Sequence, residues 1–431
     1  MTPTPSTREA TGSHPPYDPT VGLVLAGGGA RGAYEIGALS VLLPYLEARR
    51  ERPGIVVGTS IGALNGAHLA ATAHLPAARA IKGAIALWRQ VDFRDIIDPF
   101  LSPGELGRLL LYVGELLRVP KAELRSLLDN SPMERTVPDK VDFDQLRRNV
   151  EAGALSRLAV VATSYATGES VVFHTGRDGA DPPVDRKRAI SYVAAQVEAV
   201  HVRASSAIPV FFPAVRVDEP AAASGWYGDG GTRLNTPIKP ALKLGARKVV
   251  VVGLNSSVTP ENPKLDEPDV FDGAAQFVQA LLADQLAQDV ATLATANEQL
   301  AGRTPGKGAP GGHHEPVPYI FLAPSGRFEV GDLARKVYEQ SFSGLRAKTG
   351  SRDLAALGYV LNAGRDAVRG DLLSFLFFHR NFVDALIARG REDAKQWVAA
   401  VGDGDPWQLR YSPPGVGEMR RPRRRPAPVP A

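Results

Sequence analysis

The sequence contains no cysteine among its 431 residues. Disulfide bonds, thiolate nucleophiles and cysteine-ligated zinc or iron–sulfur sites are therefore excluded, so covalent catalysis would have to use another residue. Long apolar runs are also absent, because the densest one, residues 372–378, is far shorter than the about 20 residues of a spanning helix. Residues 1–20 are rich in Pro, Thr and Ser and lack the apolar core of a secretory signal. We therefore expect a solvated N-terminal arm and a cytoplasmic protein.

The remaining composition is that of a folded globular protein, with 44% apolar and 22% charged residues. The net charge is only +4, but five arginines cluster within residues 420–425 of a Pro-rich tail. No aromatic residues are interleaved with them, so nucleic-acid binding is not expected. The tail and the apolar segments 109–117 and 372–378 are candidate contacts with an anionic membrane surface. Core packing is the favoured interpretation of the two apolar segments, and a solubilising end is the equal alternative for the tail.

After the N-terminal arm, the sequence contains two units that each consist of a strand, a glycine-containing turn and a helix. Residues 21–25 and 55–57 read as buried strands, and each is followed by a small-residue helix. Two such units predict an α/β fold with a mainly parallel sheet. The pattern predicts further strands at residues 158–163, 171–174, 215–217, 248–254 and 318–322, and helices over 103–119, 273–300 and from 326 to about 400.

Residues 27–32 read Gly-Gly-Gly-Ala-Arg-Gly and lie between the first strand and its helix. This matches the dinucleotide pattern, but such a site also needs an acidic residue after the second strand, which here ends in Gly58-Thr59-Ser60. The favoured alternative is an oxyanion hole, because consecutive glycines let backbone N–H groups point at one anionic oxygen. Arg31 would either support the same charge or hold the loop by an ion pair, and the sequence leaves both open.

Residues 58–62 read Gly-Thr-Ser-Ile-Gly, which is the pattern of a nucleophile elbow. An apolar strand enters and an Ala-rich helix leaves, so Ser60 is expected to sit exposed on a sharp turn. Gly58 and Gly62 remove side chains that would crowd the serine. The alternative is a serine that merely caps an ordinary helix.

A serine nucleophile needs a base within hydrogen-bond reach. Of the eight histidines, only His174, His201 and His379 stay as candidates, since the others lie in the N-terminal arm, in a Gly/Pro-rich loop or along the helix that leaves the elbow. A lone histidine near apolar residues is more often packed than catalytic. The residues alone therefore do not identify the base.

The glycine loop, the serine motif and a later Asp-Gly-Gly at residues 229–231 occur in the order found in patatin-like phospholipases, which the chain resembles from residue 21 to about 254. The resemblance implies a Ser60–Asp229 dyad without histidine that acts on acyl esters of lipids. Asp178 and Asp272 also precede Gly-Ala, but the first lies in a polar loop and the second precedes a long helix that it could cap. Asp229 is favoured because it follows a strand and the aromatic pair at residues 226–227.

In this hypothesis Ser60 attacks the ester carbonyl, Asp229 accepts the proton, and the amides of Gly28, Gly29 and Ile61 hold the oxyanion. The expected site is completed by the other loop and motif residues: Gly27, Arg31, Gly32, Gly58, Gly62, Gly230 and Gly231. No cofactor or metal is expected, since no EF-hand-like spacing occurs. Two alternative functions remain. The protein could be a patatin fold without catalytic activity that serves in binding, or an α/β-hydrolase with a Ser-His-Asp triad.

The resemblance implies a patatin-like three-layer α/β fold, and the helical pattern beyond residue 325 predicts a C-terminal helical extension. We expect an N-terminal arm at residues 1–19, a catalytic domain at 20–325 with a flexible insertion at 301–316, a helical region at 326–410 and a Pro/Arg-rich tail at 411–431. The expected partner is a lipid or acyl-ester substrate. The sequence does not indicate an oligomeric state.

Overall fold

The computed structural model describes residues 17–98, 126, 128–176, 181–254, 284–301, 315–324, 326, 329–342, 354 and 367–410. The expected helix at 103–119, the Arg-rich tail, and both Asp178 and Asp272 lie outside the described residues.

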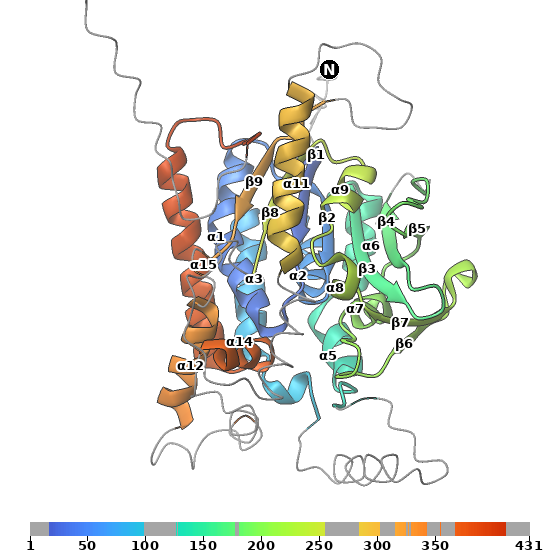
Figure 1. The fold of residues 1–431 in the computed structure, drawn as a ribbon, viewed down its shortest axis with the longest axis vertical. Coiled ribbons are helices and arrows are strands. Elements are labelled where there is room, and N and C mark those ends of the chain that lie inside the picture. Colours follow the sequence, from blue (N-terminus) through green and yellow to red (C-terminus); the bar gives the residue numbers. More distant parts are fainter. Residues whose placement is uncertain are drawn as a thin grey trace, which may run out of the picture.

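The described residues form a nine-stranded sheet in the order β5-β4-β3-β2-β1-β8-β9, with β7 also paired to β3 and β6 paired to β7 (Figure 1). Five of these pairings are parallel and three, all involving β3 or β7, are antiparallel. The expected mainly parallel sheet is therefore confirmed. The strands are β1 (Asp18–Leu25), β2 (Pro53–Thr59), β3 (Arg157–Ser164), β4 (Ser170–Gly176), β5 (Ile190–Ala194), β6 (Val215–Val217), β7 (Gly225–Asp229), β8 (Lys248–Val252) and β9 (Tyr319–Leu322).

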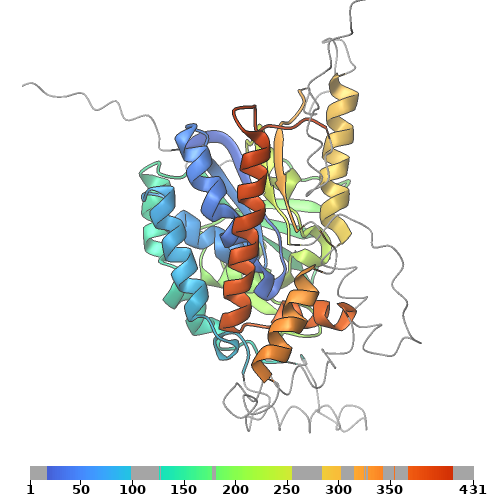
Figure 2. The ribbon, with the colours of Figure 1, turned by 90° about the vertical axis from the view of Figure 1, so that its left-hand side faces the viewer.

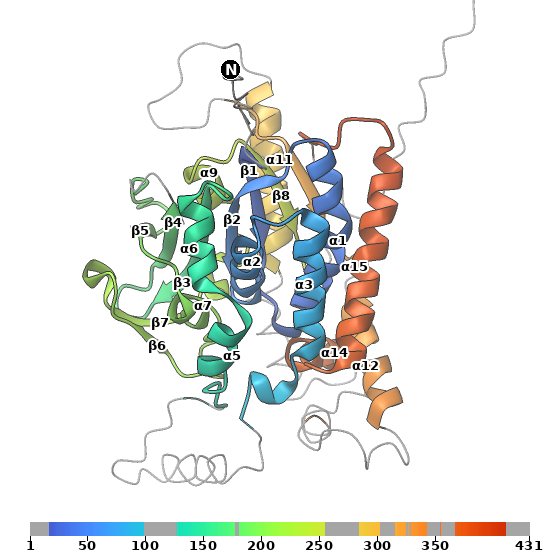
Figure 3. The same cartoon turned by 180° about the vertical axis from the view of Figure 1, so that it is seen from behind.

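Helices cover both faces of the sheet, which makes the three layers. Along β1, Leu23 and Leu25 point into one apolar core while Val24 points into the other, because side chains alternate along a strand. One face packs against α9 (Ile238–Lys243) and α11 (Asp284–Ala301), and Figure 2 shows α11 on that side. The other face packs against a larger set that Figure 3 shows in front of the strands: α1 (Gly32–Ala48), α2 (Ile61–Ala71), α3 (Ala77–Gln90), α6 (Phe143–Glu151) and α15 (Arg380–Val401).

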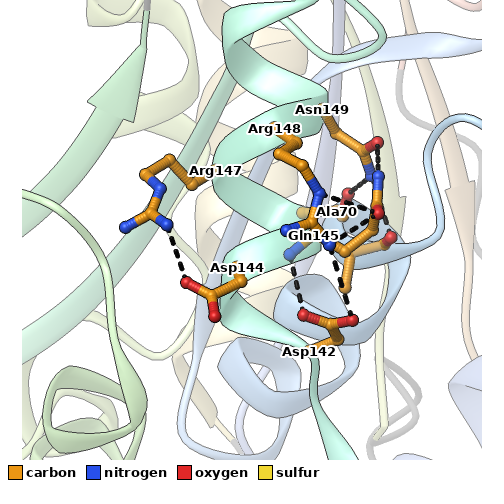
Figure 4. A network of polar contacts seen from close by, with 8 residues as sticks. Ala70, Asp142, Asp144, Gln145, Arg147, Arg148 and Asn149 are labelled. Carbon is orange, nitrogen blue, oxygen red and sulfur yellow. Dashed lines mark hydrogen bonds and ion pairs between the residues drawn. The ribbon is translucent and has the colours of Figure 1, made fainter.

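A buried amide fixes the far end of α2. Asn149 of α6 donates from Nδ2 to the carbonyls of Ala70 and Ala71, each at 2.8 Å (Figure 4). Asp142 caps the start of α6 by accepting from the Gln145 amide at 2.7 Å. These bonds satisfy groups that helix ends leave unpaired, and they hold α2 against the sheet.

Three C-terminal helices, α12 (Glu329–Phe342), α14 (Ala367–Leu376) and α15, continue the same fold. Helix α15 buries Phe382, Leu386 and Ile387 against α1, with at most 2% of each side chain exposed. Leu373 and Phe377 are fully buried, so core packing is confirmed for residues 372–378. The helical extension is thus packed onto the α/β layers.

The strand predictions fail at three places. Strands β5 and β7 were not expected, and β1 begins at Asp18, three residues earlier than expected. Strand β7 reads Gly-Trp-Tyr-Gly-Asp, and Gly and Asp are depleted in strands, so pairing with β3 and β6 overrides a weak local preference.

Candidate active site

Ser60 lies in the sharp turn between β2 and α2. Its φ of 54° and ψ of −123° are unusual for a residue with a side chain, and such strain is typical of a nucleophile elbow. The turn requires Gly62, because a Cβ there would lie 2.4 Å from the Leu25 carbonyl oxygen. Ser60 is only 5% exposed, so the expected exposed position is wrong. Neighbouring strand ends and the glycine loop enclose it.

The register of the sheet brings Ser60 and Asp229 together. Strand β2 runs parallel to β3 and ends with Thr59 opposite Val161. Strand β7 runs in the opposite direction and ends with Asp229 opposite Ala162, the next residue of β3. Because β4 occupies the other edge of β3, β2 and β7 meet end to end along one edge.

Asp229 is fully buried at this junction. Its Oδ1 accepts a 2.6 Å hydrogen bond from the Gly231 amide, at the start of α8 (Gly231–Leu234), which Gly230 caps. Burial raises the pKa of Asp229 to about 7, while hydrogen bonding to the Ser60 hydroxyl and the Gly231 amide acts in the opposite direction. Oδ2 has no hydrogen bond of good geometry within the described residues. A carboxyl group that titrates near neutrality can exchange protons with the serine.

Ser205 was not assigned a role from the sequence. It lies at the end of α7 (Ala199–Ser205) and is fully buried. Its Oγ accepts from the Ser60 amide at 2.8 Å and lies 2.5 Å from the Val161 carbonyl oxygen, to which it donates. Ser205 therefore ties the elbow to β3. In the sequence, Ser205 lies within Ala-Ser-Ser-Ala at residues 204–207.

The glycine loop lies directly beside the elbow. A Cβ placed on Gly27 would be 3.0 Å from Ser60 Cβ, and one on Gly32, the first residue of α1, would be 2.5 Å from Ile61 Cγ1. The Gly27 amide donates to Asn235 Oδ1 at 2.9 Å, so this amide is already occupied. Asn235 was another residue without an assigned role.

Three amides at this place have no acceptor within the part of the chain that the structure describes. Among the described residues, none accepts a hydrogen bond from the N–H groups of Gly28, Gly29 or Ile61. Ile61 is the first residue of α2, and Gly28 caps the short 3₁₀ helix η1 (Gly29–Arg31). Free backbone donors at a helix start suit an anionic oxygen.

The structure distinguishes the two uses considered for Arg31. Arg31 is 1% exposed, and its guanidinium forms a 2.6 Å ion pair with Asp371 of α14 and donates from Nε to Ser374 Oγ at 2.7 Å. It also lies over the Phe375 ring, 3.9 Å from the centroid. Arg31 therefore holds the loop by an ion pair.

The histidine candidates have other partners. His174 Nε2 lies 3.0 Å from Asp181, and His201 accepts on Nδ1 from the Glu198 amide at 3.1 Å. His379 stacks on Phe377, with ring centroids 5.4 Å apart. Within the described part of the chain, no hydrogen bond joins a histidine to Ser60 or Asp229.

The model of one protein family, described as patatin-like phospholipase, matches residues 23–242, about half of the chain. The chain belongs to the patatin-like phospholipase family. Membership makes it a lipid acyl hydrolase in general terms. The matched range contains the glycine loop, Ser60 and Asp229, and it ends before the C-terminal helices.

Solved structures similar to this patatin-like protein include the following two. VipD from Legionella pneumophila is 14% identical, with a TM-score of 0.27 over 89% of this chain and 75% of that chain. Human GIVD cytosolic phospholipase A2 in complex with methyl gamma-linolenyl fluorophosphonate is 14% identical, with a TM-score of 0.33; the match covers 88% of this chain but only 59% of that chain. Among curated proteins, none matches the chain.

Two further observations concern metals and membranes. Among the described residues, no group of three or more His, Cys, Asp or Glu side chains could hold a metal ion. None of the described helices combines the length and apolarity needed to span a bilayer.

Proposed function

We propose that the protein hydrolyses acyl esters of lipids through a dyad of Ser60 and Asp229, in the manner of a phospholipase A, lysophospholipase or esterase. The observation that carries the proposal is the junction along β3, where the strained Ser60 and the buried Asp229 end two facing strands. The nucleophile is an alcohol and its partner a carboxyl group with a pKa of about 7. This combination can run general-base catalysis near neutral pH.

In the first half of the reaction, Ser60 Oγ attacks the ester carbonyl carbon while Asp229 takes the hydroxyl proton. The carbonyl oxygen becomes an oxyanion beside the free amides of Gly28, Gly29 and Ile61. The tetrahedral intermediate collapses, the C–O bond to the alcohol breaks, and Asp229 returns the proton to that alcohol. The acyl group then remains on Ser60.

In the second half, water attacks the acyl-enzyme and gives a proton to Asp229. Collapse releases the fatty acid and returns the proton to Ser60. No step requires a metal or a cofactor, because the amides and the carboxyl group supply both charge stabilisation and proton transfer.

The substrate class follows from the family. Lipid esters lie in interfaces, so we propose peripheral contact with an anionic membrane surface rather than insertion, and a cytoplasmic location. We also propose residues 20–325 as the catalytic domain, with residues 326–410 as its helical extension.

The direct test compares wild type with Ser60→Ala and Asp229→Asn, using a fluorophosphonate probe and a p-nitrophenyl ester series. Both variants should lose at least about 10³-fold in kcat, since each removes a group that acts as a unit with the other. His174→Ala and His201→Ala serve as matched controls, because each replaces another buried residue that has a hydrogen-bond partner. Their labelling should equal that of wild type.

Two results would change the proposal. Loss of labelling in a histidine variant that remains folded would favour a triad over the dyad. No labelling and no turnover by folded wild type on lipid vesicles would favour a silent binding protein.

A further inference from the structure

The glycine loop is held at both of its ends. On one side, Asn235 accepts from the Gly27 amide, and Glu35 accepts from the Ala26 amide at 2.9 Å. On the other side, the Arg31 guanidinium contacts α14 through Nε and Nη2. The free amides of Gly28 and Gly29 lie between these two attachments.

The Arg31 side chain makes three polar contacts with α14. Arg31 donates from Nε to Ser374 Oγ at 2.7 Å and from Nη2 to the Asp371 carbonyl at 2.8 Å, and it pairs with the Asp371 carboxylate at 2.6 Å. Ser374 Oγ in turn donates to the Asp371 carbonyl at 2.6 Å. All three residues are at least 97% buried, so solvent does not weaken the pair as it does at a surface.

The backbone of the loop also packs directly on α14. Gly29 has a φ of +57°, and a Cβ there would lie 2.1 Å from the Phe375 carbonyl oxygen. The Phe375 ring lies under the Arg31 guanidinium. Helix α14 therefore acts as the outer wall of the loop, although it lies beyond residue 242, where the match to the family model ends.

We propose that Asp371 and Ser374 are positioning residues of the hydrolytic site: they fix, through Arg31, the backbone amides that hold the oxyanion. The catalytic part of this inference rests on the proposed function; the attachment of the loop to α14 does not. Neither residue touches the substrate. Oxyanion stabilisation depends on donors that are in place before charge develops, so a looser loop lowers kcat more than it changes KM.

The test uses the full chain with Asp371→Asn and Ser374→Ala. The matched control is Asp393→Asn, because Asp393 is also a buried C-terminal carboxylate that pairs with an arginine, Arg389, and binds α1 through Tyr34, without touching the loop. Since an unpaired buried arginine can destabilise the protein, the double variant Arg31→Met with Asp371→Leu removes both charges together.

Three measurements separate positioning from simple stabilisation: hydrogen exchange of the peptide that contains residues 26–32, steady-state kinetics, and binding of an acyl trifluoromethyl ketone. In Asp371→Asn we expect faster exchange in this peptide, a kcat lower by about 10- to 1,000-fold with KM within about threefold, and a parallel loss of affinity for the ketone, whose adduct carries an oxyanion. Ser374→Ala should show the same changes, but smaller. Asp393→Asn should show none of them below its melting temperature.

The inference is overturned if the folded Asp371 and Ser374 variants keep wild-type exchange, or keep wild-type kcat despite faster exchange. It is also overturned if Asp393→Asn lowers kcat equally. Failure of the proposed function gives a different result, since wild type would then show no Ser60-dependent turnover while the exchange measurement still tests the attachment to α14.

Discussion

At Asp229, burial and hydrogen bonding act on one carboxyl group in opposite directions. Burial favours the protonated acid, whereas the Ser60 hydroxyl and the Gly231 amide favour the ion, and the resulting pKa is about 7. The protonated form cannot accept the serine proton. The same burial that makes the carboxylate a stronger base therefore also determines the pH below which it stops working.

This balance predicts the pH dependence of activity. The rate of Ser60 labelling by a fluorophosphonate should fall about tenfold per pH unit below pH 7 and level off above it, because only ionised Asp229 is a base. The measurement is the labelling rate between about pH 5 and 9 at constant ionic strength. Circular dichroism over the same range controls for unfolding.

The ionisation of Asp229 is expected to change stability in the direction opposite to activity: activity rises with pH, whereas the contribution of Asp229 to stability falls. Because the folded pKa of Asp229 lies above its ordinary value of 3.8, its contribution to stability is complete below that value and is lost as pH rises through about 7. A labelling rate that is flat from pH 5 to 9, while the protein stays folded, would rule out Asp229 as the base.

The sequence allowed prediction of these two residues but not of their environment. Ser60 was found from a five-residue pattern and its flanks, and Asp229 from the family resemblance. The Ser205 hydroxyl and the Asn235 amide were missed because each acts on a backbone N–H more than 100 residues away in sequence. Long-range hydrogen bonds of this kind produce no repeating pattern of residues in the sequence from which they could be predicted.

At the scale of elements, one buried amide joins the three helices α1, α2 and α3. Asn65 of α2 donates to Glu35 Oε2 at 2.7 Å and to the Gly32 carbonyl at 3.1 Å, both on α1. It accepts from Trp88 Nε1 of α3 at 2.9 Å. Glu35 is fully buried, which raises its pKa to about 8, and its other oxygen accepts from the Ala26 amide.

Replacing Asn65 by Ala should therefore lower the free energy of unfolding by about 2 to 4 kcal/mol, since it leaves two buried groups, Glu35 Oε2 and Trp88 Nε1, without a partner. Urea unfolding measures the change. Asn381→Ala is the control, because Asn381 is exposed and its loss should cost less than about 0.5 kcal/mol. Equal costs for the two variants would show that the network contributes nothing.

The elements themselves were predicted unevenly. Strands with β-branched runs, such as β2 and β8, were recognised because both of their faces are buried and the apolar run is continuous. Strand β7 was missed, although it carries Asp229, because its pairing with β3 rather than its composition makes it a strand. The candidate site thus depends on β7, a strand that the local amino-acid composition does not predict.

At the scale of the whole molecule, the boundary expected near residue 325 does not coincide with a gap in packing. Helix α15 lies along α1, and Tyr34 donates to Asp393 at 2.8 Å. Four α15 side chains, Phe382, Val383, Leu386 and Ile387, are at least 98% buried. Burial of this kind contributes roughly 6 to 12 kcal/mol, which is comparable to the about 5 to 15 kcal/mol that separates a folded domain from its unfolded chain.

Ending the chain after residue 325 should therefore give an aggregated or unfolded product without Ser60 labelling. A chain ended after residue 410 is the matched control, because it retains every described helix, and it should label like wild type. Size-exclusion chromatography and probe labelling make the comparison. A soluble, monomeric and active fragment of residues 1–325 would show that the C-terminal helices are an independent unit.

The ion pair between Arg31 and Asp371 also sets an order of events on the ribosome. The two residues are 340 positions apart, so at about 5 to 20 residues per second the glycine loop emerges roughly 17 to 70 s before its partner has been made. Ser60 and Asp229 are both made within that interval, while the loop still has no outer wall. The backbone donors that we propose for the oxyanion are therefore held in place only after residue 371 has been made.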